Sequence, residues 1–135
     1  YGRYSTHHHL SLDRTSLLAW LSAIEDQYDA KNPYHNAMHA ADVVASLHYF
    51  LQLPNMQRQL QPIDVLAALL SALVHDAGHL GINNKFLETT QSELAITYND
   101  VSVLENHHVA TAFRLLGEEG SDWAAGLSDE QASSP

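Results

Sequence analysis

The sequence predicts an all-α fold, and two observations support this. Apolar residues recur every three or four positions along several segments, as they do on one face of a helix. No segment alternates apolar and polar residues for more than a few positions, as a β-strand would, and there is no internal repeat. At 135 residues, 45% of them apolar, the chain is long enough for one compact domain. We therefore expect a multi-helix bundle.

Two amphipathic helices are expected in the first part of the chain. The first has its apolar positions within 17–28 and follows Thr15 and Ser16, which could cap it. Asn36 could cap a second helix that ends near Leu51. The inward stripe of this second helix should hold His39, Val43, Leu47 and Phe50.

A third helix should begin at Pro62, because proline suits the first position of a helix. After a turn at Pro54, this segment is apolar on nearly every face up to Val74. The helix should therefore be central and buried, and it should deliver His75 and Asp76 at its far end.

The later part of the chain is predicted to hold two short helices, over 83–91 and 92–98, and a longer one over 102–116. Gly78 and Gly81 precede them and allow the backbone to turn. The inward face of the longer helix should carry Leu104, His108, Ala112 and Leu115.

Charge and composition exclude several classes of partner. The 16 acidic and 6 basic side chains give a formal charge of −10, which repels nucleic acid polymers and anionic membranes. The longest apolar run, 65–74, is too short to cross a bilayer, and the N-terminus has no signal-peptide core. Without cysteine, nothing favours secretion, so we expect a soluble, cytoplasmic protein. A site for an anionic substrate would have to draw its positive charge from bound metal ions.

The histidines are the strongest sign of such a site. Six of the 10 fall in three groups: His35 and His39, His75 and His79, His107 and His108. Imidazole and carboxylate together suit zinc, whereas carboxylate and water suit magnesium or manganese, so a mixed set with Asp76 could hold two unlike metals. We assign no function to the triplet 7–9, which could be native or a tag remnant.

Three stretches that carry these residues resemble a known family. They are YHNAMHAAD (34–42), HDAGHLGINNKF (75–86) and SELAITYNDVSVLENHH (92–108). In this order they resemble the class I 3′,5′-cyclic nucleotide phosphodiesterases, and the likeness runs from about residue 18 to 116. One departure is Ala77, where the family usually has a larger apolar residue. The resemblance implies the helical, HD-type catalytic domain of that family.

Roles follow from this resemblance, position by position. His35 would be the general acid that protonates the departing O3′ atom, and Tyr34 would line the substrate pocket. The zinc ligands would be His39, His75 and Asp76, with Asp76 also bridging to magnesium or manganese. The residues that support these ligands, their waters and the motif loop would be His79, Asn84, Glu105 and His108. The two metals would activate water and neutralise charge on the phosphate.

Some of these residues also have structural interpretations. Glu105 stands three positions after Ser102, so the two could form a capping box at the start of the last helix. Asp42 could be a further ligand or, more simply, a partner for a neighbouring histidine. His48 falls on a different face from His39 and is expected to be structural or exposed.

The expected function is the hydrolysis of cAMP, cGMP or both to 5′-nucleotides in signal transduction. The family completes its zinc site with a later aspartate and clamps the purine with a glutamine, and neither can be matched in this sequence. We therefore expect 1–135 to be a single partial domain, the N-terminal portion of the catalytic domain, with any regulatory domains or oligomer contacts outside it. Two alternatives stay open: a broader metal-dependent phosphohydrolase of the HD type, and a non-catalytic module that binds metal or a partner.

Overall fold

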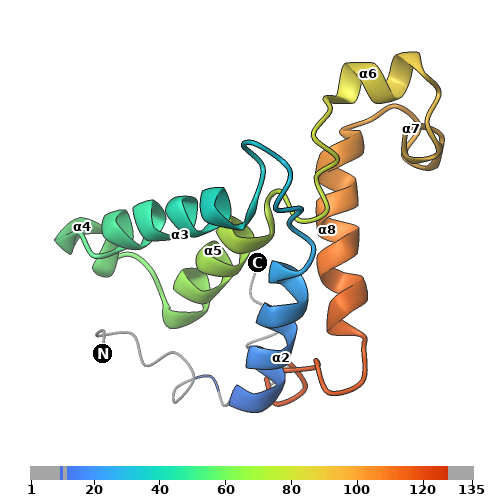
Figure 1. Cartoon of the computed structure of the whole chain (residues 1–135). Helices are drawn as coiled ribbons and strands as arrows, with labels where there is room; N and C mark the ends of the chain where they lie inside the picture. Colours follow the sequence, from blue (N-terminus) through green and yellow to red (C-terminus); the bar gives the residue numbers. More distant parts are fainter. Residues whose placement is uncertain (1–9, 11, 128–135) are drawn as a thin grey trace.

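The computed structural model describes residue 10 and residues 12–127, and all regular elements among them are helices (Figure 1). In chain order these are α2 (Arg14–Glu25), α3 (Ala37–Leu51), α4 (Pro54–Gln57), α5 (Pro62–Val74), α6 (Asn84–Thr89), α7 (Glu93–Thr97) and α8 (Val103–Leu116). The predicted all-α class is thus confirmed. None of these helices is long and apolar enough to span a membrane. The histidine triplet 7–9 lies outside the described residues.

The first helix begins earlier than its sequence suggests. Its N-cap is Asp13, whose carboxylate accepts hydrogen bonds from the backbone N–H groups of Thr15 (3.3 Å) and Ser16 (3.0 Å). The prediction that these two residues are the caps is wrong, because Asp13 offers a charged acceptor to the free N–H groups of the first turn. The helix ends at Glu25, so Tyr28 belongs to the loop that follows it.

Helices α3 and α5 pack side by side (Figure 1). As predicted, Asn36 caps α3, accepting from the N–H groups of Met38 (3.1 Å) and His39 (3.2 Å). The prediction that Phe50 faces inward at the end of α3 is wrong, since its side chain is 56% exposed. A single helical turn, α4, replaces the predicted turn at Pro54.

Helix α5 begins at Pro62 as predicted, and a capping box between Gln61 and Asp64 caps its N-terminus. The prediction that this helix is central and buried is wrong about its burial, since only Val65, Leu66 and Ala72 are buried. Its uncovered face borders a mainly apolar groove of about 460 Å³ between α5 and α8. Apolar composition alone does not decide how many neighbours cover a helix.

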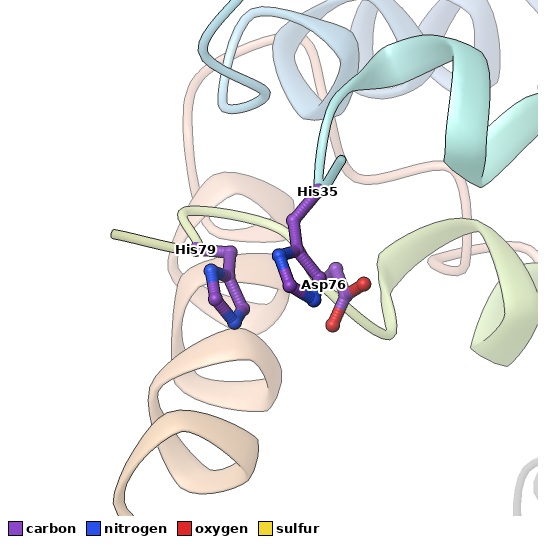
Figure 2. Close-up of side chains that lie close together, drawn as sticks. All are labelled: His35, Asp76 and His79. Atoms are coloured by element: carbon purple, nitrogen blue, oxygen red, sulfur yellow. The ribbon is translucent and has the colours of Figure 1, made fainter. Parts of the chain in front are cut away.

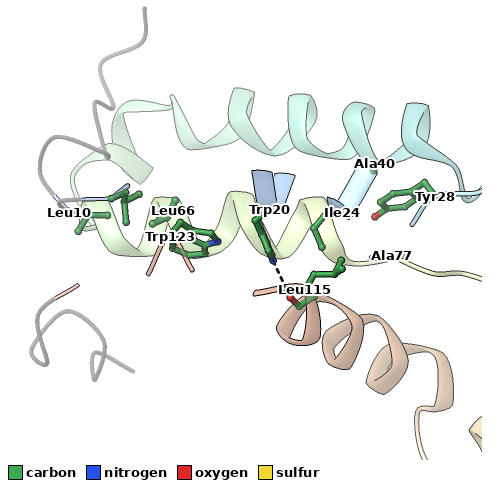
Figure 3. Close-up of a cluster of buried hydrophobic side chains, with 11 residues drawn as sticks. Leu10, Trp20, Ile24, Tyr28, Ala40, Leu66, Ala77, Leu115 and Trp123 are labelled. Carbon is green, nitrogen blue, oxygen red and sulfur yellow. Dashed lines mark hydrogen bonds between the residues drawn. The ribbon is translucent and has the colours of Figure 1, made fainter. Parts of the chain in front are cut away.

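The core lies between α2, α5 and α8 (Figure 3). Trp20 is at its centre. Its Nε1–H donates to the carbonyl oxygen of Ala112 on α8 (3.1 Å), and its ring packs edge-on against that of Trp123, with the ring centroids 5.7 Å apart. Ile24 is fully buried beside it. This core fixes α8 against the end of α2, close to the loop that follows α5.

Helices α6 and α7 form a separate corner at the N-terminal end of α8 (Figure 1). Two adjacent asparagines organise it. Asn83 caps its own helix, α6, by accepting from Phe86 N–H (2.9 Å), whereas Asn84 accepts from Leu104 N–H (2.9 Å) at the start of α8. A small buried cluster beneath them consists of Leu87, Ala95, Val103 and Leu104.

The predicted capping box at the start of α8 is absent. Ser102 lies in the left-handed region, with φ 44°, and its side chain caps nothing. The Glu105 carboxylate instead accepts from the side-chain amide of Asn84 at 2.9 Å. The free N–H of Leu104, in the first turn of α8, thus finds its acceptor on Asn84, which is remote in the sequence.

Candidate metal centre

Four segments bring the predicted site residues together. His35 lies just before α3 and His39 in its first turn, while His75 and Asp76 follow directly from α5. The loop after α5 adds His79, and α8 adds His108. Gly78 and Gly81, predicted to allow a turn, have φ values of 75° and 74°, which bend this loop back toward α2 and α3.

Three of these residues present their ligand atoms to one another. Nε2 of His39 lies 3.3 Å and Nε2 of His75 lies 3.1 Å from Oδ2 of Asp76, and the two nitrogens are 3.2 Å apart. Zinc bonds of about 2.0–2.1 Å in a tetrahedron place neighbouring ligand atoms about 3.3 Å apart. The spacing of the three atoms therefore matches the edges of a zinc coordination tetrahedron.

Hydrogen bonding shows that His75 is prepared to bind a cation. Its Nδ1 lies 2.8 Å from the carbonyl oxygen of Ala72, which can only accept, so Nδ1 carries the proton. In the neutral ring Nε2 then has a lone pair aimed at the Asp76 carboxylate. Two acceptors at 3.1 Å repel each other unless a cation or proton lies between them. The donor set thus fits a divalent metal ion.

His35 and His79 form a second group with Asp76 (Figure 2). Their rings are stacked, with centroids 3.7 Å apart and planes inclined by 11°. Nδ1 of His79 accepts from the backbone N–H of Gly81 at 2.9 Å, so in the neutral ring its proton is on Nε2. Burial, followed by the nearby His35, lowers the pKa of His79 and favours this neutral form. His79 is therefore a hydrogen-bond donor, suited to holding water or a carboxylate, rather than a free metal ligand.

His108, on α8, lies beside Asp76 and is hydrogen-bonded to the residue that follows it. It is 3% exposed, its Nδ1 donates to the carbonyl oxygen of Ala77 (2.8 Å), and its Nε2 lies 3.8 Å from Oδ1 of Asp76. Burial lowers the pKa of His108. Its inward position agrees with the helical pattern, as do the buried Leu104, Ala112 and Leu115.

Glu105 and Asn84 border an open cavity of about 520 Å³ next to this cluster. The hydrogen bond from Asn84 lowers the pKa of Glu105, so its carboxylate stays charged. The cavity is lined by His35, His79, Gly81, Ile82, Asn83, Asn84, Phe86, Leu104 and Glu105. Tyr34 does not line it, although its ring lies 4.5 Å from that of His39 and 4.9 Å from that of His35.

Two residues depart from what the sequence suggested. Asp42 is exposed and belongs to neither group of ligand atoms. His107 received no role, but its ring packs against Gly78 in the loop that carries the site. The adjacent His107 and His108 pair in the sequence was the signal that could have drawn attention to it.

Fold and site together are those of a helical protein in which histidine and aspartate ligand atoms converge, as they do around a bound metal ion. The chain belongs to the 3′5′-cyclic nucleotide phosphodiesterase family, which its residues 34–134 match. This family membership implies the use of divalent metal ions.

Relatives of known activity agree with this assignment. The chain is 47% identical over 116 residues to the 3′,5′-cyclic-AMP phosphodiesterase 4C of Mus musculus, a match that covers 86% of this chain and 17% of the relative. It is 43% identical over 122 residues to isoform F of the 3′,5′-cyclic-AMP phosphodiesterase of Drosophila melanogaster, covering 90% of this chain and 18% of that one.

A solved structure shows the same arrangement of helices. The phosphodiesterase domain of the Salpingoeca rosetta rhodopsin phosphodiesterase is similar to this chain, with a TM-score of 0.87 and 36% sequence identity. The match covers 95% of this chain and 38% of the solved one. The chain therefore spans less than half of that domain and under a fifth of the two curated relatives.

Proposed function

We propose that this chain supplies the metal-binding part of a site that hydrolyses 3′,5′-cyclic nucleotides, cAMP or cGMP or both, to 5′-nucleotides. The observation that carries the proposal is the convergence of His39, His75 and Asp76 within 3.1–3.3 Å, beside the stacked pair His35 and His79. Family membership and the names of the relatives support the substrate class.

The three converging residues would hold zinc, and Asp76 would also take part in binding magnesium or manganese. Bound divalent ions supply an activated water and neutralise charge on the phosphoryl oxygens. His79 would hold water or the Asp76 carboxylate through its Nε2–H, and His108 would fix the residue after Asp76 through its Nδ1–H bond to Ala77. Glu105, fixed by Asn84, would add a charged acceptor at the edge of the cavity.

His35 would act as the general acid. Attack of water on phosphorus breaks the bond to O3′, and a ring N–H of His35 would give its proton to that oxygen. The His79 ring, stacked at 3.7 Å, holds the His35 ring in place. Tyr34, packed on His35 and His39, would border the nucleotide rather than line the cavity itself.

The extent of the domain is part of the proposal. Since the match covers 38% of the solved phosphodiesterase domain, residues 1–135 would correspond to its N-terminal portion, and the site would be open on one side. An open site weakens electrostatic stabilisation of the transition state. We therefore expect the isolated chain to bind metal but to hydrolyse cyclic nucleotides weakly or not at all.

Metal titration and hydrolysis assays on the same chain test these points. Zinc and manganese titrations, followed by calorimetry, should show binding that is lost in Asp76→Asn and kept in His35→Asn. Hydrolysis of cAMP and cGMP should stay far below that of an intact phosphodiesterase domain, and any residual activity should disappear in His35→Asn. Absence of metal binding by the unmodified chain would refute the proposal.

The same assays separate the alternatives. A broader phosphohydrolase would cleave a generic phosphodiester such as bis(p-nitrophenyl) phosphate as readily as a cyclic nucleotide. A non-catalytic module would show metal binding without turnover, even when the remaining helices of a homologous domain are added in trans.

A further inference from the structure

We propose that His107 is a positioning residue, which together with His108 clasps two consecutive peptide groups of the 75–81 loop and so sets where Asp76 and His79 lie. This inference rests on the proposed function for its effect on metal binding. The clasp itself is a feature of the fold and can be tested separately. We refer to the contacts of His107 with Gly78 and of His108 with Ala77 as the histidine clasp.

The two contacts come from adjacent residues of α8. His108 donates from Nδ1 to the carbonyl oxygen of Ala77 at 2.8 Å. The ring of His107 lies against the next residue, Gly78, with Nε2 3.0 Å from the place a Cβ atom would take there. Side chains of neighbouring helical residues diverge by about 100°, so both can reach the loop only because it runs across the helix surface.

The fit around Gly78 shows that the contact with His107 is close. A Cβ atom at this position would lie 3.0 Å from Nε2 of His107 and 3.7 Å from Oγ1 of Thr111, and φ is +75°. On its other side the N–H of Gly78 donates to the carbonyl oxygen of Gln27 at 3.2 Å, in the loop just after α2. Residue 78 is thus held between α2 and α8.

The position of the clasp in the loop gives it a consequence for the site. Ala77 and Gly78 are the only residues between Asp76, which belongs to both groups of candidate ligand atoms, and His79, which belongs to one. A shift of either peptide group would change the direction of both side chains. Outer contacts of this kind commonly change metal affinity by roughly 10- to 100-fold when they are removed.

The protonation state of His107 follows from the geometry. Nε2 is the ring atom nearest to Gly78, and burial lowers the pKa of His107, which favours a neutral ring. A neutral ring with its proton on Nε2 would donate to the Gly78 carbonyl. Nitrogen-15 NMR of the unmodified chain should therefore show the Nε2–H tautomer of His107, and a Nδ1–H tautomer would overturn the clasp.

Two amide variants test the effect on the site. His107→Gln places an N–H donor where Nε2 lies, whereas His107→Asn places it nearer to Nδ1, one methylene short of Gly78. We expect zinc affinity, measured by competition with a chromophoric chelator, to fall about 10-fold or more in His107→Asn and to stay within about 3-fold in His107→Gln. His48→Asn is the control, because His48 is a half-buried histidine on α3 whose ring contacts the side chain of Gln52.

Each outcome decides a separate point. Equal zinc affinity of the two His107 variants, or an equal loss in His48→Asn, would overturn the proposal. If the unmodified chain binds no zinc, the proposed function fails, and hydrogen exchange of the Gly78 amide decides on the clasp. Faster exchange in His107→Asn than in His107→Gln supports it, and equal exchange rules it out.

Discussion

The hydroxyl of Tyr28 donates to the carbonyl oxygen of Leu73 at 2.6 Å, although 45 residues separate them. This bond satisfies one of the last carbonyl groups of α5, immediately before His75 and Asp76. Burial raises the pKa of Tyr28 to about 12, so the hydroxyl remains a neutral donor over the physiological range. The end of α5, and with it the candidate metal centre, is thus fixed to the loop after α2.

Tyr28→Phe should lower the free energy of unfolding by about 1 kcal/mol, because it leaves the Leu73 carbonyl without this donor in a buried position. Urea denaturation measures the change. Tyr49→Phe is a matched control, since Tyr49 is 67% exposed and its loss of a hydroxyl should be near neutral. Equal effects of the two substitutions would show that the bond to Leu73 contributes nothing.

Asn84→Ala should destabilise the chain by about 1 kcal/mol, as loss of a helix cap does, and should raise the pKa of Glu105. Both effects follow from its two hydrogen bonds, to the N–H of Leu104 and to the Glu105 carboxylate. The pKa is measured by carbon-13 NMR of the Glu105 carboxyl. Asn83→Ala is the control: it removes the cap of α6 and should leave the Glu105 pKa unchanged.

Without metal, the chain should lose stability as the pH falls below about 6.5, the ordinary pKa of histidine. Burial lowers the pKa of His79, His107 and His108 in the folded state, so the unfolded chain takes up protons first. The stability is therefore complete above the unfolded pKa and declines toward the folded pKa.

Urea midpoints at pH 7.5 and 5.5, in the presence of a chelator, measure this dependence. His108→Asn places an amide near Nδ1, keeps a donor for Ala77 and cannot titrate, so its stability should depend less on pH. A pH dependence as steep as that of the unmodified chain would contradict the assignment to His108.

Zinc should stabilise the folded chain, because His39, His75 and Asp76 come together only in the folded state. At a free concentration of 100 times Kd, the gain is about 2.7 kcal/mol, which corresponds to a rise in Tm of roughly 10 °C. Asp76→Asn should abolish this rise, whereas Glu119→Gln, at an exposed acidic residue after α8, should keep it. A zinc-dependent rise of the same size in Asp76→Asn would place the ion elsewhere.

Local signals in the sequence were enough to predict most helix boundaries. Asn36 and Ser92 accept from N–H groups of the next three residues, and Pro62 has the φ that the first position of a helix needs, so their roles are visible in the sequence itself. Ser102 failed as a cap because the first turn of α8 is served by Asn84, which is 20 positions from Leu104. A contact between residues so far apart produces no local sequence pattern that could predict it.

Burial and site geometry were predictable only in part. The apolar composition of α5 indicated a buried helix, but composition does not say which neighbours cover each face, and only three of its residues are buried. The resemblance selected His39, His75 and Asp76, and the structure brings them together. The proton positions on His75 and His79 depend on backbone groups placed by tertiary contacts, which the sequence pattern does not specify.

The hydrogen bonds of the adjacent Asn83 and Asn84 hold the starts of α6 and α8 next to each other. The residues from 85 to 103 therefore form a loop-like segment that leaves the candidate metal centre and returns to it. Changes in the length of its outer turn, near Thr90, need not be transmitted to the ligands. Lengthening a flexible loop is entropically cheap, about 0.6 kcal/mol for each doubling. This corner is therefore where the chain should best accept an inserted peptide, a label or a fused domain.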